Sequence, residues 1–117
     1  MREIIFYPTE SDKSPVEEFL DSLSPKEAQK VTWVLRLIVE LPRVPSHYFK
    51  KLINTGDIWE VRVILGRNVF RILGFWDGPK SIVLTNAFQK KTQKTPKQAT
   101  QIAEARKGDY LRRRDRK

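Results

Sequence analysis

The sequence feature that most restricts the fold is a two-residue break, Gly66-Arg67, between two segments with the composition of β-strands. Residues 58–65 and 68–76 are rich in branched and aromatic side chains, which favour strands. A two-residue loop that begins with glycine suits a type II′ turn, which joins adjacent antiparallel strands. The two segments therefore predict a β-hairpin in which Leu65 lies opposite Asn68.

That register divides the hairpin into two faces, because side chains alternate along a strand. One face is almost entirely apolar and is expected to lie in the core. The other face places Arg62 directly opposite Arg71, with Glu60 on the diagonal. Because like charges that face each other destabilise a sheet, we expect compensation by Glu60 or by a bound phosphate, which suits paired guanidinium groups. Alternatively, both arginines point into water on a half-exposed sheet.

Three segments have the pattern of a helix start: Ser or Thr, then Pro, then Glu or Gln at the fourth position. The first side chain caps the helix, and Pro occupies a position where its absent N–H costs nothing. The segments are residues 14–17, 24–27 and 95–98. They predict helices over 15–22 and 25–41, and a third helix that begins at Pro96 and frays into residues 112–117.

Further strands are expected at Ile4–Tyr7 and Ser81–Gln89, which are again rich in branched residues. The order β-α-α-β-β-β-α predicts an α+β fold, with a twisted antiparallel sheet flanked by helices. The length suits one domain. We expect this domain to cover residues 1–111 and to be followed by a basic C-terminal tail, residues 112–117.

Charge is distributed unevenly along the chain. The 23 Lys and Arg residues exceed the 14 Asp and Glu residues, for a net charge of +9. Residues 90–117 hold 11 of these cations and 3 of the carboxylates, a net +8, so the remaining body is nearly neutral. An excess of this kind favours a polyanionic partner, with nucleic acid first and an acidic protein second.

Composition also excludes several classes of protein. With no cysteine and a single histidine, His47, the chain cannot be a disulfide scaffold or a thiolate zinc protein, and we expect no metal and no cofactor. No apolar run approaches the roughly 18 residues that span a bilayer. The N-terminal residues are too short and too acidic for a signal peptide. We therefore expect a cytoplasmic protein without a membrane partner.

Further phosphate-binding candidates lie around the hairpin. If Trp76 meets Ser81 across the turn at residues 77–80, Asn86 faces Arg71 on the neighbouring strand. A basic run precedes the third helix, where backbone N–H groups and lysines converge on phosphate, although such runs are also common in solvated loops. This set of candidates comprises Lys90, Lys91, Lys94, Lys97, Arg67 and Asn86.

In order, segments 58–63, 69–73 and 87–96 resemble the phage Gp49-like, or HigB-like, branch of the RelE/ParE toxin superfamily. They share a Trp-Glu-hydrophobic-Arg strand, a hydrophobic-Arg-hydrophobic strand and a Phe-x-Lys-Lys-x-x-x-Lys-Thr-Pro segment. The resemblance implies a RelE-like fold and a type II toxin-antitoxin toxin with a helix-turn-helix antitoxin as partner. It also implies a ribosome-dependent endoribonuclease that cleaves mRNA and inhibits translation.

By position, the resemblance assigns catalysis to Arg62, Arg71 and Lys90 or Lys91. The chain departs from RelE in having Glu60 in place of a strand lysine and Lys97 or a neighbour in place of a tyrosine, so the general base stays open. Arginine cannot lose its proton in practice, which suits it to bind phosphate and stabilise charge. The lysines or Glu60 are left for proton transfer.

Two other functions remain possible from the sequence. The chain could be a ParE-like gyrase inhibitor without catalysis, or a phage-related nucleic-acid-binding module with an inert site. The grouping of Arg62, Arg71 and Lys90 favours the endonuclease, because a pure protein inhibitor has no need of clustered cations at one end of a sheet. On this reasoning Arg71→Ala abolishes cleavage and leaves the melting temperature near the wild-type value or raises it.

Overall fold

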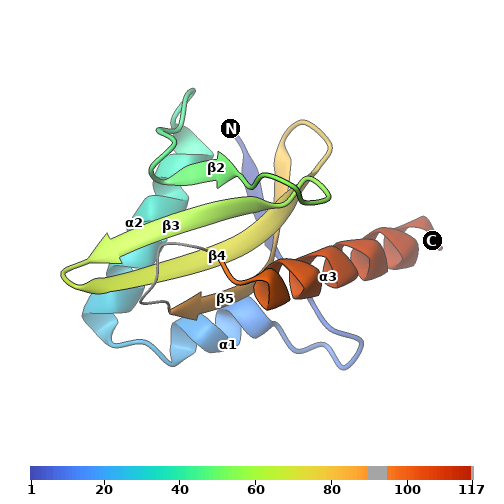
Figure 1. Cartoon of the computed structure of the whole chain (residues 1–117), viewed down its shortest axis with the longest axis horizontal. Coiled ribbons are helices and arrows are strands. Elements are labelled where there is room, and N and C mark those ends of the chain that lie inside the picture. The colour runs from blue at the N-terminus through green and yellow to red at the C-terminus, as the bar shows by residue number, and fades with distance from the viewer. Residues whose placement is uncertain (90–94, 117) are drawn as a thin grey trace.

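The computed structural model describes residues 1–89 and 95–116. Within these residues the fold is α+β, with helices on both faces of a single mixed sheet (Figure 1). The elements in chain order are β1 (Glu3–Phe6), α1 (Pro15–Asp21), α2 (Pro25–Glu40), β2 (Phe49–Lys51), β3 (Trp59–Leu65), β4 (Asn68–Asp77), β5 (Ser81–Gln89) and α3 (Lys97–Asp115).

The sheet has the strand order β1-β5-β4-β3-β2. The predicted antiparallel core of β3, β4 and β5 is confirmed, but the complete sheet is mixed because β1 pairs in parallel with β5. The prediction also lacked β2, which pairs with β3 through Phe49 opposite Val61. Its three residues are too few for an alternating pattern to stand out in the sequence.

The hairpin of β3 and β4 has the predicted register. Leu65 lies opposite Asn68, and Arg62 lies opposite Arg71. A type II′ turn requires a positive φ at the first of its two central residues and not at the second. Gly66 has φ +61°, and Arg67 is not among the residues with positive φ, so the turn meets both conditions. Glycine adopts this left-handed backbone without the steric cost of a Cβ atom, which explains why the turn begins there.

The predicted register between β4 and β5 is wrong. Asp77, rather than Trp76, lies opposite Ser81, and a bulge at Gly74 shifts the pairing again. A Cβ atom at Gly74 would lie 2.4 Å from the Val83 carbonyl oxygen, so only glycine fits this irregularity. As a result, Phe88 lies opposite Arg71, and Asn86 lies opposite Leu73.

Two of the three predicted helix caps are present. The Ser14 and Ser24 side chains accept hydrogen bonds from the N–H groups of Glu17 and Glu27, and α2 has the full reciprocal capping box. At α3 the prediction is wrong, because Pro96 is the N-cap residue and no side chain caps the helix. The helix then continues through Asp115, so part of the segment expected to fray is helical.

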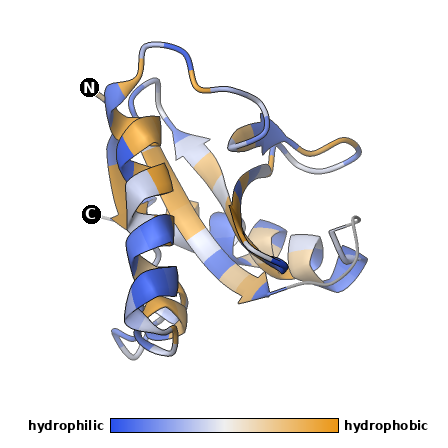
Figure 2. Ribbon diagram, turned by 90° about the vertical axis from the view of Figure 1, so that its left-hand side faces the viewer, coloured by the Kyte–Doolittle hydropathy of each residue, from blue (hydrophilic) through white to orange (hydrophobic). Residues whose placement is uncertain are grey.

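Two apolar cores lie on opposite faces of the sheet. On one face α1 and α2 pack against the predicted apolar side of the hairpin, through residues such as Val34, Ile38, Val61 and Phe70. Figure 2 shows the twisted strands passing α2, with hydrophobic stretches along both. On the other face, α3 packs through Ala99 and Ala103 against a smaller cluster that includes Leu73, Phe75 and Ile58. This second face also carries the two arginines.

Candidate functional site

The centre of the site is a buried ion pair between neighbouring strands. Arg71 Nη1 on β4 donates to Glu60 Oε1 on β3 at 2.8 Å. Glu60 has no exposed surface, and Arg71 is 2% exposed. The second carboxylate oxygen, Glu60 Oε2, accepts a hydrogen bond from the Thr95 hydroxyl. Both oxygens of Glu60 are therefore engaged, one by the sheet and one by the residue that leads into α3.

Arg62 lies beside this pair. It is directly opposite Arg71 in the sheet, it is half-buried, and its backbone N–H donates to the Tyr48 carbonyl oxygen at 2.8 Å. Its Nε is buried and has no hydrogen-bond partner within the described residues. A buried donor without a partner costs free energy. Arg62 is adjacent to Arg71 in the sheet but is not among the residues that line the neighbouring cavity.

A cavity of about 500 Å³ opens above the ion pair. Glu60 and Arg71 form part of its lining from the sheet, Lys50 contributes from β2, and Lys97 and Thr100 contribute from the first turns of α3. The remaining lining residues are Leu52, Ile53, Asn54, Thr55 and Thr95. Three cations and one carboxylate among these residues leave an excess of positive charge around the cavity.

This arrangement is suited to bind an anion. Lys50 lies opposite Glu60 in the sheet and is exposed, as is Lys97 at the start of α3. Ammonium groups at the rim and a guanidinium group below them attract phosphate, and partial burial strengthens the attraction relative to bulk water. Glu60 is poorly placed to act as a general base, because it is buried and both its oxygens already accept hydrogen bonds.

The structure separates the other sequence candidates from this cavity. Arg67 is exposed in the hairpin turn and does not line it. Asn86 is buried beneath α3, where its amide donates to the Ala99 carbonyl oxygen at 3.2 Å. The single histidine of the sequence, His47, also does not line the cavity and lies against the Tyr48 ring, at 4.1 Å between ring centroids. Lys90, Lys91 and Lys94 lie outside the described residues.

Seven lining residues of this site were not candidates from the sequence, among them Lys50, Thr95 and Thr100. Lys50 belongs to β2, the strand that the prediction lacked. Without that strand, the sequence offers no reason to place Lys50 opposite Glu60. Thr95 was expected to cap α3, and its hydroxyl instead binds Glu60. The useful signal in the sequence was the diagonal position of Glu60 relative to Arg71, which made their pairing one of the two compensations expected for the facing arginines.

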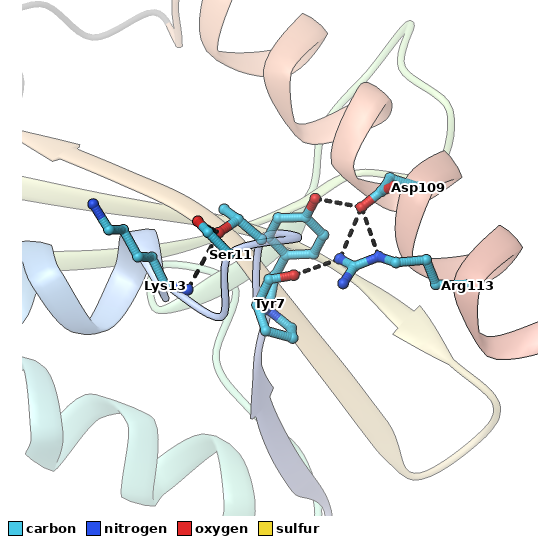
Figure 3. Close-up of polar contacts among 7 residues, drawn as sticks. Tyr7, Ser11, Lys13, Asp109 and Arg113 are labelled. Atoms are coloured by element: carbon cyan, nitrogen blue, oxygen red, sulfur yellow. Dashed lines mark hydrogen bonds and ion pairs between the residues drawn. The ribbon is translucent and has the colours of Figure 1, made fainter.

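A second polar cluster fastens the later part of α3 to the end of β1 (Figure 3). The Tyr7 hydroxyl donates to Asp109 Oδ2 at 2.6 Å, and Arg113 binds the same carboxylate at 2.8 Å. The hydrogen bond from Tyr7, followed by the charge of Arg113, lowers the pKa of Asp109. Burial, and then the hydrogen bond to Asp109, raises the pKa of Tyr7. This cluster is occupied by its own contacts, so its role is structural.

The fold and site together define a class: a small α+β protein with a mixed five-stranded sheet and a cation-rich cavity between the sheet and its last helix. No helix in the described part of the chain is long and apolar enough to cross a membrane.

Residues 18–108 match the family model described as phage derived protein Gp49-like (DUF891). The chain therefore belongs to the Gp49-like family, a phage-derived family of toxin-like proteins, and the resemblance found in its strands is confirmed. No curated protein is significantly similar to the chain.

Proposed function

We propose that this chain is the toxin of a type II toxin-antitoxin pair, and that it is a metal-independent, ribosome-dependent endoribonuclease that cleaves mRNA and so inhibits translation. Its partner in this proposal is a helix-turn-helix antitoxin. Membership of a toxin-like, phage-derived family supports the toxin assignment. The excess of Lys and Arg supports a polyanionic target.

The single observation that carries the proposal is the Arg71–Glu60 pair below a cavity with lysines at its rim. A structural ion pair alone needs neither an opening above it nor further cations around it. Arg62, with a buried Nε that lacks a partner among the described residues, adds a donor beside the same site. A phosphodiester in the cavity would be surrounded by charge-assisted donors.

The proposed chemistry is attack by an RNA 2′-hydroxyl on the adjacent phosphate, with departure of the 5′-oxygen. Arg62 and Arg71 stabilise the charge that develops on the phosphate oxygens. Lys90 and Lys91 transfer the protons, since neighbouring cations favour the neutral amine. Glu60 positions Arg71 rather than acting as the base. Lys94, Lys97 and Arg67 bind flanking phosphates, and Asn86 supports the start of α3.

The most direct test is induced expression without an antitoxin, followed by mapping of RNA 5′ ends. We expect growth to stop and new 5′ ends to appear within translated messages. An Arg62→Ala variant, produced at the same level, should lose both effects. Growth arrest with intact mRNA and altered DNA supercoiling would instead favour the gyrase inhibitor. Unimpeded growth in the presence of folded protein would contradict every toxin assignment.

A further inference from the structure

An exposed apolar side chain stands at the mouth of the cation-rich cavity. Ile53 is 90% exposed, and it lines the cavity together with Lys50 and Lys97. Among the large hydrophobic residues of the described chain only the terminal Met1 has a larger exposed fraction. Single exposed apolar residues are common on protein surfaces. The exposure of Ile53 alone therefore does not indicate a function. The second observation is that its loop is held in one conformation.

The loop that carries Ile53 is closed by its own hydrogen bonds. The Leu52 N–H donates to the Ile58 carbonyl oxygen at 2.8 Å, where β2 and β3 separate. The Thr55 hydroxyl donates to the Leu52 carbonyl oxygen at 2.9 Å and accepts from the Ile58 N–H at 3.1 Å. Asn54, next to Ile53, takes the left-handed backbone with φ +57°. The loop is thus a compact turn whose backbone conformation is fixed.

Contacts outside the turn hold it against the neighbouring elements. Lys51 Nζ and Asp57 Oδ1 form an ion pair at 2.7 Å across its base. On α3, Glu104 accepts from the Gly56 N–H at 3.1 Å, and Lys107 Nζ donates to the Gly56 carbonyl oxygen at 2.8 Å. The turn is therefore tied to the helix that forms the opposite rim of the cavity, and Ile53 is presented in one place.

We propose that Ile53 determines substrate specificity by packing against an unpaired nucleobase next to the bound phosphate. This inference rests on the proposed function and deepens it: the preferred substrate is single-stranded RNA with its bases unstacked. A fixed apolar side chain beside phosphate-binding cations offers what a nucleotide presents, an anionic backbone and an apolar base face. A base in a duplex is stacked on both sides and cannot reach Ile53.

The test compares two short oligonucleotides that cannot be cleaved, because both carry 2′-O-methyl groups. One is single-stranded RNA with all its bases, and the other has the same backbone without bases. Fluorescence anisotropy gives the affinity of each for the purified full chain. We expect Ile53→Ser to weaken binding of the first by about threefold to tenfold and to leave binding of the second unchanged. Ile53→Leu should restore binding of the first.

Ile64→Ser is the matched control, since Ile64 is also exposed but does not line the cavity. It should alter neither affinity. If Ile53→Ser weakens both oligonucleotides equally or affects neither, while the wild type still binds them in a salt-dependent way, the inference is wrong and the proposed function stands. If the wild type binds neither oligonucleotide, the inference is wrong, whereas the proposed function, which depends on the ribosome, is decided by the mapping of RNA 5′ ends.

Discussion

Arg71 and Glu60 form a 2.8 Å ion pair in which neither side chain retains more than a trace of exposure, although they lie below an open cavity. Removing two charges from water costs several kcal/mol, and their attraction only roughly offsets this cost. An apolar pair of similar volume would stabilise the sheet at least as well. We therefore interpret the role of the pair as positioning: Glu60 holds the Arg71 guanidinium in a fixed orientation below the cavity.

The first prediction concerns Arg71→Ala. Because the substitution leaves the Glu60 carboxylate buried without its charge partner, we expect the free energy of unfolding to fall by about 3–5 kcal/mol. Urea denaturation followed by circular dichroism measures this loss. The sequence alone predicted a melting temperature near the wild-type value or higher. The burial of the pair is what reverses that expectation.

The double substitution Glu60→Met with Arg71→Met separates stability from function. It removes both charges and keeps the volume, so we expect the free energy of unfolding to return to within about 1–2 kcal/mol of wild type while RNA cleavage is lost. If the double variant is as unstable as Arg71→Ala, the buried charge of Glu60 does not cause the instability.

A second prediction concerns Arg62, which is half-buried and faces Arg71 across the sheet. Arg62→Ala removes a like-charge opposition worth a few tenths of a kcal/mol, so stability should change by less than about 1 kcal/mol. Affinity for RNA should fall, and the slope of log K against log salt should decrease by about 0.7 for one lost phosphate contact.

Lys80→Ala is the matched control for Arg62→Ala. Lys80 is exposed at the turn between β4 and β5, nine positions beyond Arg71 in the chain, yet its substitution removes the same charge. Titrations of both variants at several salt concentrations should show a smaller slope for Arg62→Ala than for Lys80→Ala. Equal slopes would mean that only the net charge matters and that Arg62 makes no phosphate contact.

A third prediction tests the position of Thr95, whose hydroxyl binds Glu60 instead of capping α3. Aspartate is a good N-cap residue, so Thr95→Asp should be harmless or stabilising if residue 95 caps the helix. Because residue 95 instead contacts Glu60, the Thr95→Asp substitution places two carboxylates next to each other. We expect the free energy of unfolding to fall by about 2 kcal/mol or more at neutral pH.

Thr95→Ser keeps the hydroxyl group and should stay within about 1 kcal/mol of wild type. Thermal melting of the two variants side by side distinguishes the roles of residue 95. An increase in the melting temperature of Thr95→Asp would contradict the contact with Glu60.

A fourth prediction uses the lowered pKa of Asp109, caused first by the Tyr7 hydrogen bond. A carboxyl group with a lowered pKa in the folded state stabilises that state when ionised. Its contribution is complete above its ordinary pKa of 3.8 and is lost as the pH falls through the lower folded value. Asp109→Asn should therefore cost about 1–2 kcal/mol at neutral pH, and this difference should shrink below about pH 4.

Urea denaturation of wild type and Asp109→Asn across this pH range measures the difference. Asp57 is a useful comparison. Its hydrogen bond and ion pair with Lys51 also lower its pKa, but it is exposed and lies in the loop that carries Ile53. A difference for Asp109→Asn that stays constant down to about pH 3 would show that the ionised carboxylate does not stabilise the fold.

Much of the site was predictable because it depends on local pattern. The Gly66-Arg67 turn fixes the pairing of Arg62 with Arg71, and the two-residue period then places Glu60 on the same face. The error at Asn86 also has a local cause. The turn after β4 pairs Asp77 rather than Trp76 with Ser81, and the bulge at Gly74 adds a second one-residue shift, so Asn86 lies opposite Leu73. No periodicity in the sequence marks either shift.

The sequence by itself determined the hairpin, two helix caps, the apolar face of the sheet and the diagonal position of Glu60 relative to Arg71, because each depends on residues close in the chain. Tertiary structure decided the rest. The contact of Thr95 with Glu60, the alignment of Lys50 with Glu60 and the attachment of the Ile53 loop to α3 join residues 10 to 51 positions apart. Such contacts form only when β2 joins the sheet and α3 packs against it, so the cavity is a product of packing that no local pattern encodes.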